Sequence, residues 1–164
     1  MEYRKLPHGD EQISIIGLGN SSLGALGEAE AEKTVAMAVE NGINYFDMAA
    51  GDATPFPAYG RAVSGCRDKV FFQVHFGADY RSGKYGWTLD LDEIKRSIDW
   101  QLKALRTDYI DFGLIHCIDE ASDLKNRHRA WNHCLYGGFE AAGRDPSHRL
   151  VLPYACCGRA GAGY

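Results

Sequence analysis

The chain has 164 residues and a formal net charge of −4 at pH 7. A chain of this length suggests one domain with a real hydrophobic core, and its acidic balance argues against nucleic acid or an acidic membrane surface as a partner. No apolar segment follows Met1 to Lys5, and no run approaches the roughly 18 apolar residues of a membrane span. We therefore expect a soluble, cytoplasmic protein.

The cysteines are few and do not form a recognisable framework. They are odd in number, contain no CxxC pair, and comprise Cys66, Cys117, Cys134, Cys156 and Cys157. Without a secretory signal a disulfide framework is not expected. We interpret these residues as reduced thiols without a role.

The first elements are a hairpin and a short core strand. Residues 2–6 and 12–16 alternate in polarity around Pro7 to Asp10, which predicts a β-hairpin that would cover the bottom of a barrel. The chain then enters a core strand at Ile15 to Gly19 and leaves it through Asn20 to Ser22. The glycines that follow do not have the spacing of a dinucleotide fingerprint, so tight turns explain them better.

Three helices are predicted, over residues 28–41, 56–64 and 90–105. The first has an acidic start and ends before Gly42, a typical stop residue. The last should be capped by Asp90 or Asp92, and its apolar residues recur every three or four positions. These apolar residues are Ile94, Ile98, Leu102 and Leu105. The Gly/Tyr-rich stretch 77–88 shows no regular period and is predicted to be a loop.

Apolar strands that end in polar side chains alternate with these helices. They are predicted over residues 44–47, 70–75 and 108–119, and they carry Asp47, His75 and His116 toward their carboxyl ends. Alternation at intervals of roughly 30 residues is typical of βαβ units in a parallel sheet. Because parallel strands end at one rim, where α/β folds hold their chemistry, these three side chains should converge there.

Several motifs in this order resemble the N-terminal half of the aldo/keto reductases. They are Gly17-Leu18-Gly19, Gly42 to Asp47, Val70 to Gly77, and Asp108 to Asp111 continuing through Leu114-Ile115-His116. The resemblance covers residues 1 to about 126. It is strongest to a bacterial branch whose members often carry a C-terminal iron–sulfur domain, so it implies an iron–sulfur cluster in the complete parent protein.

The resemblance implies a parallel (β/α)8 barrel, of the TIM-barrel type, with about the first four β/α units in this chain. It also implies a nicotinamide cofactor, NADP(H) or NAD(H), and a small carbonyl substrate. By position, Asp47 and His116 match the family's catalytic and cofactor-facing residues, whereas Asn20 and Ser21 match positions that approach the cofactor. In such a site a hydrogen-bond donor such as His116 would stabilise the developing oxyanion.

Two positions depart from the family pattern. The family's proton-donating Tyr lies five residues after the Asp, where this chain has Asp52, and the partner Lys is replaced by His75. A phenol with a pKa near 10 needs such a cation to act near neutral pH. We therefore expect His75 or His116 to supply the proton as a catalytic residue, with Tyr59 and Tyr80 as alternative donors.

Two rival interpretations remain open. Asp47, His75 and His116 form a two-His, one-carboxylate set that could hold iron or zinc, as in a metal-dependent lyase or hydrolase. Alternatively, the chain is a truncated, non-catalytic fragment. A complete barrel needs about 250 residues, and half a barrel would leave open sheet edges that favour self-association.

Residues 127–164 show neither a helical nor a strand period, although they contain several His and Cys residues. If codons permitted for Arg127 to Ala155 are read one base later, one allowed product has a helical period followed by RHIGLSSHTP. That string resembles the family's fifth strand. We hypothesise a frameshift near residue 127, so that 127–164 is an aberrant tail whose His and Cys residues form no site. The cofactor-gripping residues would then lie in the missing half, and the isolated chain should bind cofactor poorly or not at all.

Overall fold

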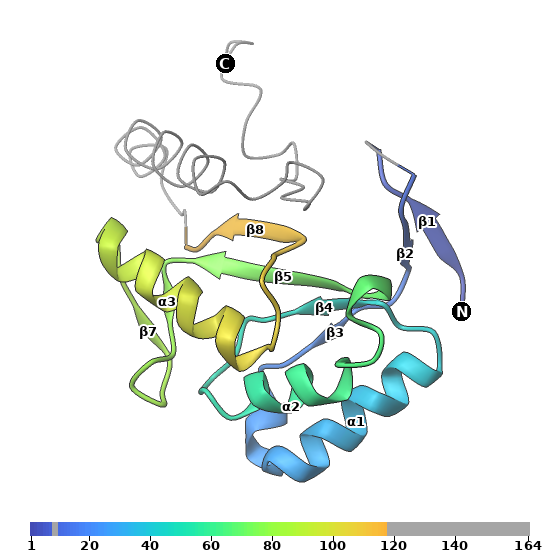
Figure 1. The fold of residues 1–164 in the computed structure, drawn as a ribbon, viewed down its shortest axis with the longest axis horizontal. Helices are drawn as coiled ribbons and strands as arrows, with labels where there is room; N and C mark the ends of the chain where they lie inside the picture. Colours follow the sequence, from blue (N-terminus) through green and yellow to red (C-terminus); the bar gives the residue numbers. More distant parts are fainter. Residues whose placement is uncertain (8–9, 118–164) are drawn as a thin grey trace.

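A four-stranded parallel sheet forms the centre of the computed structural model, which describes residues 1–7 and 10–117. Its strands lie in the order β3-β4-β5-β8, and each neighbouring pair is parallel. Their bounds are Leu18–Gly19 for β3, Tyr45–Asp47 for β4, Phe71–Phe76 for β5 and Phe112–Ile115 for β8. The carboxyl ends of all four strands therefore meet at one rim, toward the left of Figure 1.

Helices connect the successive strands, as predicted for βαβ units. They are α1 (Glu28–Glu40), α2 (Pro55–Ala62) and α3 (Leu91–Ala104), with short 3-10 helices η1 (Leu23–Leu26) and η2 (Arg67–Lys69). In Figure 1, α1 and α2 lie together on one side of the sheet. The α/β class with a parallel sheet is confirmed. Within residues 1–7 and 10–117 the sheet is open, so these residues do not test the predicted barrel.

The helix ends follow from local chemistry. Asp90 caps α3, because its carboxylate accepts hydrogen bonds from the backbone N–H groups of Asp92 and Glu93. The first helix ends at Glu40, one residue before the predicted end, and Gly42 follows with a φ of 85° that only glycine adopts without strain. The second helix begins one residue earlier than expected because Pro55 is well suited to the first helical turn.

Two small antiparallel ladders flank the sheet. The predicted hairpin is present as β1 (Tyr3–Lys5) and β2 (Gln12–Ser14), and Ser14 is hydrogen-bonded to Asn44 at the start of β4. The stretch 77–88, predicted to be a loop, contains a second ladder, β6 (Ala78–Asp79) with β7 (Gly86–Trp87). Glycine-rich segments lack the alternating pattern that reveals strands, which is why the sequence did not predict this ladder.

The two faces of the sheet carry different side chains. Phe46 and Phe72 are almost fully buried and pack edge-on against Tyr59 of α2. On the opposite face the rings of Tyr45 and Phe71 contact Phe112 at 5.6 and 6.0 Å between centroids. Because side chains alternate along a strand, the residues two positions beyond these aromatics reach the same face nearer the rim.

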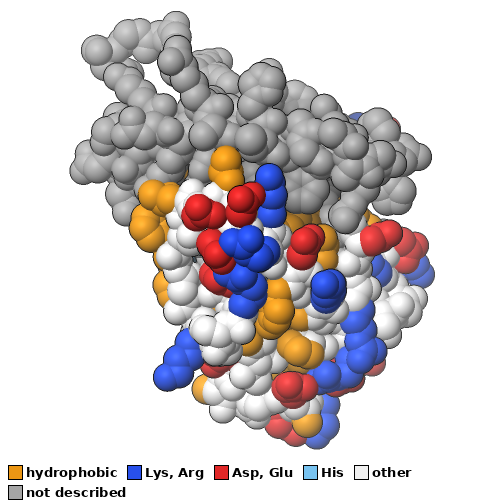
Figure 2. Space-filling view, turned by 60° about the vertical axis from the view of Figure 1, so that its left-hand side comes forward, with side chains coloured by type: hydrophobic (Ala, Val, Ile, Leu, Met, Phe, Trp, Pro, Cys, Tyr) orange, Lys and Arg blue, Asp and Glu red, His pale blue; other side chains and the backbone are white. Residues whose placement is uncertain are grey.

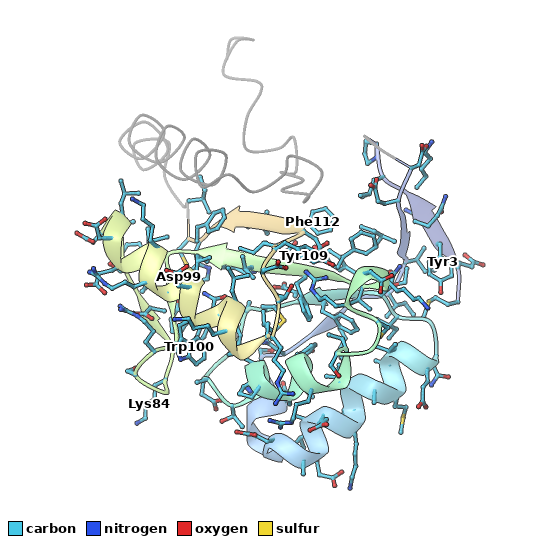
Figure 3. All side chains as sticks on the ribbon, viewed as in Figure 1. Tyr3, Lys84, Asp99, Trp100, Tyr109 and Phe112 are labelled. Carbon is cyan, nitrogen blue, oxygen red and sulfur yellow. The ribbon has the colours of Figure 1, made fainter. Side chains whose placement is uncertain are left out.

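A buried ion pair anchors the amino ends of β5 and β8. Arg67 contacts Asp111 at 2.6 Å, and the exposed fractions of the two side chains are only 12% and 5%. The same carboxylate accepts a hydrogen bond from the N–H of Phe72 at 2.8 Å, and the guanidinium stacks over the ring of Tyr109 at 3.9 Å. Figure 3 labels Tyr109 and Phe112 beside this cluster. Both charges are thus satisfied in a largely dry environment, as burial requires.

We expect Asp111→Asn to lower the free energy of unfolding by about 3–5 kcal/mol, because it leaves the buried Arg67 charge without its counter-ion. Urea denaturation followed by circular dichroism measures this change. The matched control is Asp10→Asn, since Asp10 pairs with Lys5 while its side chain is 98% exposed. Such a surface pair contributes about 0–1 kcal/mol. Equal effects of the two variants would contradict this account of the cluster.

Candidate active site

Parallel pairing brings the three predicted catalytic side chains together at the rim. Asp47 is the last residue of β4, His75 lies near the end of β5, and His116 follows β8. The register pairs Asp47 with Gln73 and His75 with Leu114, so each successive strand reaches two residues further toward the rim. The backbone N–H of His116 continues the ladder by donating to the carbonyl of Phe76. The sequence-based prediction of convergence is confirmed.

Their side chains form one continuous line of polar contacts. The Asp47 carboxylate lies 2.8 Å from His75 Nε2, and His75 Nδ1 lies 3.3 Å from His116 Nδ1. The two imidazole rings are nearly perpendicular, with an interplanar angle of 89°. His75 is the more enclosed partner, because its side chain is 13% exposed against 37% for Asp47. A line of this kind can hold and pass a proton between strands.

A tyrosine that the sequence analysis did not select completes this line. The hydroxyl of Tyr85 lies 2.8 Å from His116 Nε2, and the two rings are 5.7 Å apart. Tyr85 comes from the segment just before β7, where its N–H donates to the carbonyl of Gly51. The only sequence signal was the Tyr-rich composition of residues 77–88, which does not point to His116.

Salt bridges fix the segment that carries Tyr85 to α3. Arg81 contacts Asp79 at 2.8 Å and also pairs with Glu93 of α3, which in turn pairs with Arg96. Figure 2, which brings the left-hand side of Figure 1 forward, shows acidic and basic side chains side by side on this face. A network of mixed charges holds a surface segment better than an isolated pair, so it helps to hold the segment that carries Tyr85.

The electrostatics of the line differ between its ends. Burial alone would raise the pKa of Asp47, but the hydrogen bond and charge of His75, with the Ala49 N–H and Gln73 amide, hold that pKa below its ordinary value. Burial, followed by the charge of His75, lowers the pKa of His116, against a smaller opposing effect of Asp47. Near neutral pH, Asp47 is therefore the fixed anion of the line and His116 is neutral.

The two tyrosines predicted as alternative proton donors do not reach this line. Tyr59 is fully buried in the core, where its hydroxyl faces the carbonyl of Gly19 at 3.5 Å. Tyr80 is 1% exposed, and its hydroxyl accepts a hydrogen bond from the N–H of Ala50. Burial raises the pKa of Tyr80 to about 12. Neither hydroxyl is presented to a substrate at the rim.

The residue that takes the place of the family's Tyr is also turned away. Asp52 accepts a hydrogen bond from the N–H of Thr54 and so closes a local turn before α2. Its carboxylate lies so close to Gly24 that a Cβ there would be 2.5 Å from a carboxylate oxygen. Within residues 1–7 and 10–117, no contact of Asp52 with His75 or His116 is found.

The predicted cofactor-facing residues follow β3 at the same rim. Asn20 is 1% exposed, and neither atom of its side-chain amide finds a hydrogen-bond partner among the described residues. Ser21, the next residue, is exposed. A buried amide without partners is costly, so Asn20 fits a ligand that offers both a donor and an acceptor.

The geometry does not favour the metal interpretation. Asp47 and His116 approach opposite nitrogens of His75, so the three side chains do not face one common point. Among residues 1–7 and 10–117, no group of three or more His, Cys, Asp or Glu side chains is arranged to hold a metal ion. Neither Cys66 nor Cys117 forms a disulfide among the described residues, and the other three cysteines lie outside them.

The comparison with protein families decides the assignment. The sequence model described as the aldo/keto reductase family matches residues 15–138, well over half of the chain. The chain belongs to the aldo/keto reductase family. The position of the site, at the carboxyl ends of parallel strands, is the one expected for this type of fold.

Two bacterial relatives match this chain over part of their own length. The chain is 28% identical over 132 residues to Protein tas of Escherichia coli, covering 38% of it. It is 33% identical over 123 residues to the uncharacterized oxidoreductase YqkF of Bacillus subtilis, covering 39% of it. These alignments include 71% of this chain in both cases. The chain thus spans about two fifths of the length of these aldo/keto reductase relatives.

Solved structures agree with the fold. An aldo-keto reductase from Bacillus halodurans, in its holo form, superposes with a TM-score of 0.64 at 27% identity, covering 84% of this chain and 47% of that one. An aldo/keto reductase from Klebsiella pneumoniae, solved with NADP and acetate, gives a TM-score of 0.56 at 19% identity, covering 79% and 44%. The second likeness shows the shared fold alone.

Other sequence-based predictions are not decided by these results. The boundary at residue 126 and the hypothesised aberrant tail lie outside the described residues, and nothing found supports an iron–sulfur cluster. No helix in residues 1–7 and 10–117 is long and apolar enough to cross a membrane. Self-association stays a prediction. Within the described residues β3 and β8 are the outer strands of the central sheet.

We expect the pKa of His116 to move in opposite directions in two variants. His75→Gln removes a like charge and should raise that pKa toward its ordinary value of 6.5, whereas Asp47→Asn removes an opposite charge and should lower it further. NMR titration of the imidazole signals measures both shifts, and His116→Gln identifies the signal among the six histidines. Shifts of the same sign would contradict the described geometry.

Proposed function

We propose that this protein is a nicotinamide-dependent oxidoreductase that interconverts small carbonyl compounds and alcohols. The proposal rests on one observation, the unbroken polar line from Asp47 through His75 to His116 at the carboxyl rim. A carbonyl that gains a hydride develops negative charge on its oxygen, and catalysis requires fixed donors aimed at that charge. An imidazole N–H at the rim, oriented by a second imidazole and a carboxylate, is such a donor.

The residues after β3 fit a nicotinamide cofactor. The side-chain amide of Asn20 is buried and lacks a partner among the described residues, and Ser21 beside it is exposed at the rim. The carboxamide of a nicotinamide offers a donor and an acceptor in complementary positions. When bound, the cofactor supplies the hydride, while Asn20 and Ser21 would orient it toward His116. NADP is the cofactor present in the solved Klebsiella pneumoniae aldo/keto reductase, and we propose NADP(H) or NAD(H) for this chain.

The low solvent exposure of His75 within the polar line supports a role in acid–base catalysis. His75 is largely sheltered from water, and Asp47 is held anionic beside it. Tyr45 and Gln73, two residues before Asp47 and His75 on the same strands, are also fixed, because the hydroxyl of Tyr45 donates to the side-chain oxygen of Gln73. Burial, with the nearby charge of Asp47, raises the pKa of Tyr45 to about 12, so this hydroxyl stays a donor. Preorganised groups of this kind cost little reorganisation during reaction.

The frameshift hypothesis predicts that the isolated chain binds cofactor poorly, whereas the polar line at the rim predicts that the full 164-residue chain oxidises NADPH with at least one compound from a panel of small aldehydes and ketones. We expect the second outcome. Asp47→Asn removes the fixed anion of the line and should lower kcat/KM by roughly 10²-fold or more, within the range of general acid–base effects. The matched control is Asp99→Asn on the exposed face of α3, labelled in Figure 3, which should leave kcat/KM unchanged.

Two outcomes would overturn this proposal. If NADPH fluorescence shows no binding and no compound in the panel is reduced, the chain is the non-catalytic fragment considered above. If the purified chain contains stoichiometric metal, and activity with hydrolase or lyase substrates depends on that metal, the alternative metal-dependent function replaces the proposed one.

A further inference from the structure

The rim lacks a proton donor at the position where the family has one, yet a phenol is present nearby. Asp52 occupies that position and is engaged in the turn before α2. Tyr85 reaches the same rim from the segment before β7, and its hydroxyl contacts His116 Nε2 at 2.8 Å. The ring of Tyr85 is 43% exposed, in contrast to the buried rings of Tyr59 and Tyr80.

The segment gives Tyr85 a defined position. Its backbone N–H donates to the carbonyl of Gly51 at 3.2 Å, and its ring packs against the ring of Tyr80 with centroids 6.0 Å apart. The hydroxyl therefore stands at the end of the line Asp47–His75–His116, on the side open to solvent. A group in this position meets the geometric requirement for a general acid, which must be in hydrogen-bond reach of the reacting oxygen.

The anion at the other end determines the direction of the hydrogen bonds. Asp47 can only accept, so His75 Nε2 carries a proton toward it. If His75 also carries a proton on Nδ1, that proton points to His116 Nδ1, and His116 must then hold its own proton on Nε2, facing Tyr85. In this charged state the Tyr85 oxygen accepts from His116, so its own O–H is directed away from His116, toward Cys117 or a substrate.

Loss of one proton reverses this arrangement. With His75 neutral and its single proton on Nε2, His116 must donate from Nδ1, and its Nε2 becomes an acceptor. The O–H of Tyr85 is then used in a hydrogen bond to His116. The two states differ by one proton, and only the charged state presents the phenol proton to a substrate.

We propose that Tyr85 is the catalytic proton donor of this protein, replenished through His116 and His75. This inference rests on the proposed function. As the carbonyl carbon accepts the hydride, the π electrons of the C=O bond move to oxygen, which takes the proton of Tyr85. The Tyr85 oxygen takes the proton of His116 Nε2, and His116 Nδ1 takes that of His75 Nδ1. His75 is left neutral and regains one proton from water. The net reaction consumes the carbonyl, one hydride and one proton and forms the alcohol.

The groups around this line set its pH dependence. Asp47, His75 and His116 face it from β4, β5 and the end of β8, while Cys117 and Tyr80 are the titratable groups beside Tyr85. Burial, then the charge and hydrogen bond of Cys117, raise the pKa of Tyr85, so its phenol stays protonated at neutral pH. The rate of carbonyl reduction should fall as rising pH removes the one extra proton of the charged state.

The decisive experiment compares Tyr85→Phe with Tyr3→Phe in the full chain. Tyr3 is a matched control, because it is 45% exposed and its hydroxyl makes one hydrogen bond, to the carbonyl of Gly42. Figure 3 shows Tyr3 at the end of the molecule opposite Lys84, the neighbour of Tyr85. We expect kcat for carbonyl reduction to fall about 10²–10⁴-fold in Tyr85→Phe, with KM for NADPH unchanged, and to stay at the wild-type value in Tyr3→Phe.

The pH profile separates catalysis from a structural role. The wild type and Tyr3→Phe should lose activity at alkaline pH, whereas the residual rate of Tyr85→Phe should be independent of pH across the same range. An active wild type with an equally active Tyr85→Phe would overturn the role of Tyr85 and leave the proposed function intact. An inactive wild type would overturn both.

A second measurement does not depend on turnover. In the NMR titration of the His116 imidazole, Tyr85→Phe should shift its apparent pKa because His116 Nε2 loses its partner, and Tyr3→Phe should not. Identical titrations in the two variants would show that Tyr85 is not joined to the line in solution, which would also overturn the inference. Urea denaturation confirms that both variants are folded.

Discussion

The parallel pairing of β4, β5 and β8 is the constraint on which the rest of the structure depends. Because the register advances by two residues from strand to strand, Asp47, His75 and His116 reach the same face of the sheet at neighbouring heights. Backbone hydrogen bonds, which are the least variable contacts of a fold, thus fix the spacing of the polar line. The side chains only have to adopt their rotamers, and no loop has to close for the carboxylate and the two imidazoles to meet.

This arrangement gives each member of the line a different task. The half-buried, anionic Asp47 holds a proton on one edge of His75, and the opposite edge of His75 faces His116. His116, kept neutral by burial and by the like charge of its neighbour, can change its donor and acceptor edges without acquiring a charge of its own. The chain belongs to the aldo/keto reductase family, and it carries Asp52 and His75 where the family pattern has Tyr and Lys.

Much of this could be predicted from the sequence, and the exceptions have physical causes. The helices α1 and α3 have clear start and stop residues, and strands that end in Asp or His predict a shared polar rim. The strand predicted over 108–119 pairs only at Phe112–Ile115 within the described residues, whereas β5 has the predicted length of six residues. Tyr85 was missed because it approaches His116 across 31 positions of sequence, from a segment without periodicity. Tyr59 and Tyr80, the alternative donors, are enclosed in the core, which composition does not reveal.

The Arg67 cluster lies at the opposite ends of the same strands that carry the histidines, and β5 contributes to both through Phe72 and His75. The stabilising ion pair and the candidate site thus lie at opposite ends of one sheet. Side chains at the reactive pole can be exchanged without loosening the anchor, a freedom that barrel enzymes exploit widely. His and Asp at positions 75 and 52, in place of the family's Lys and Tyr, and a rim tyrosine such as Tyr85 from a neighbouring segment would therefore leave the Arg67 cluster intact.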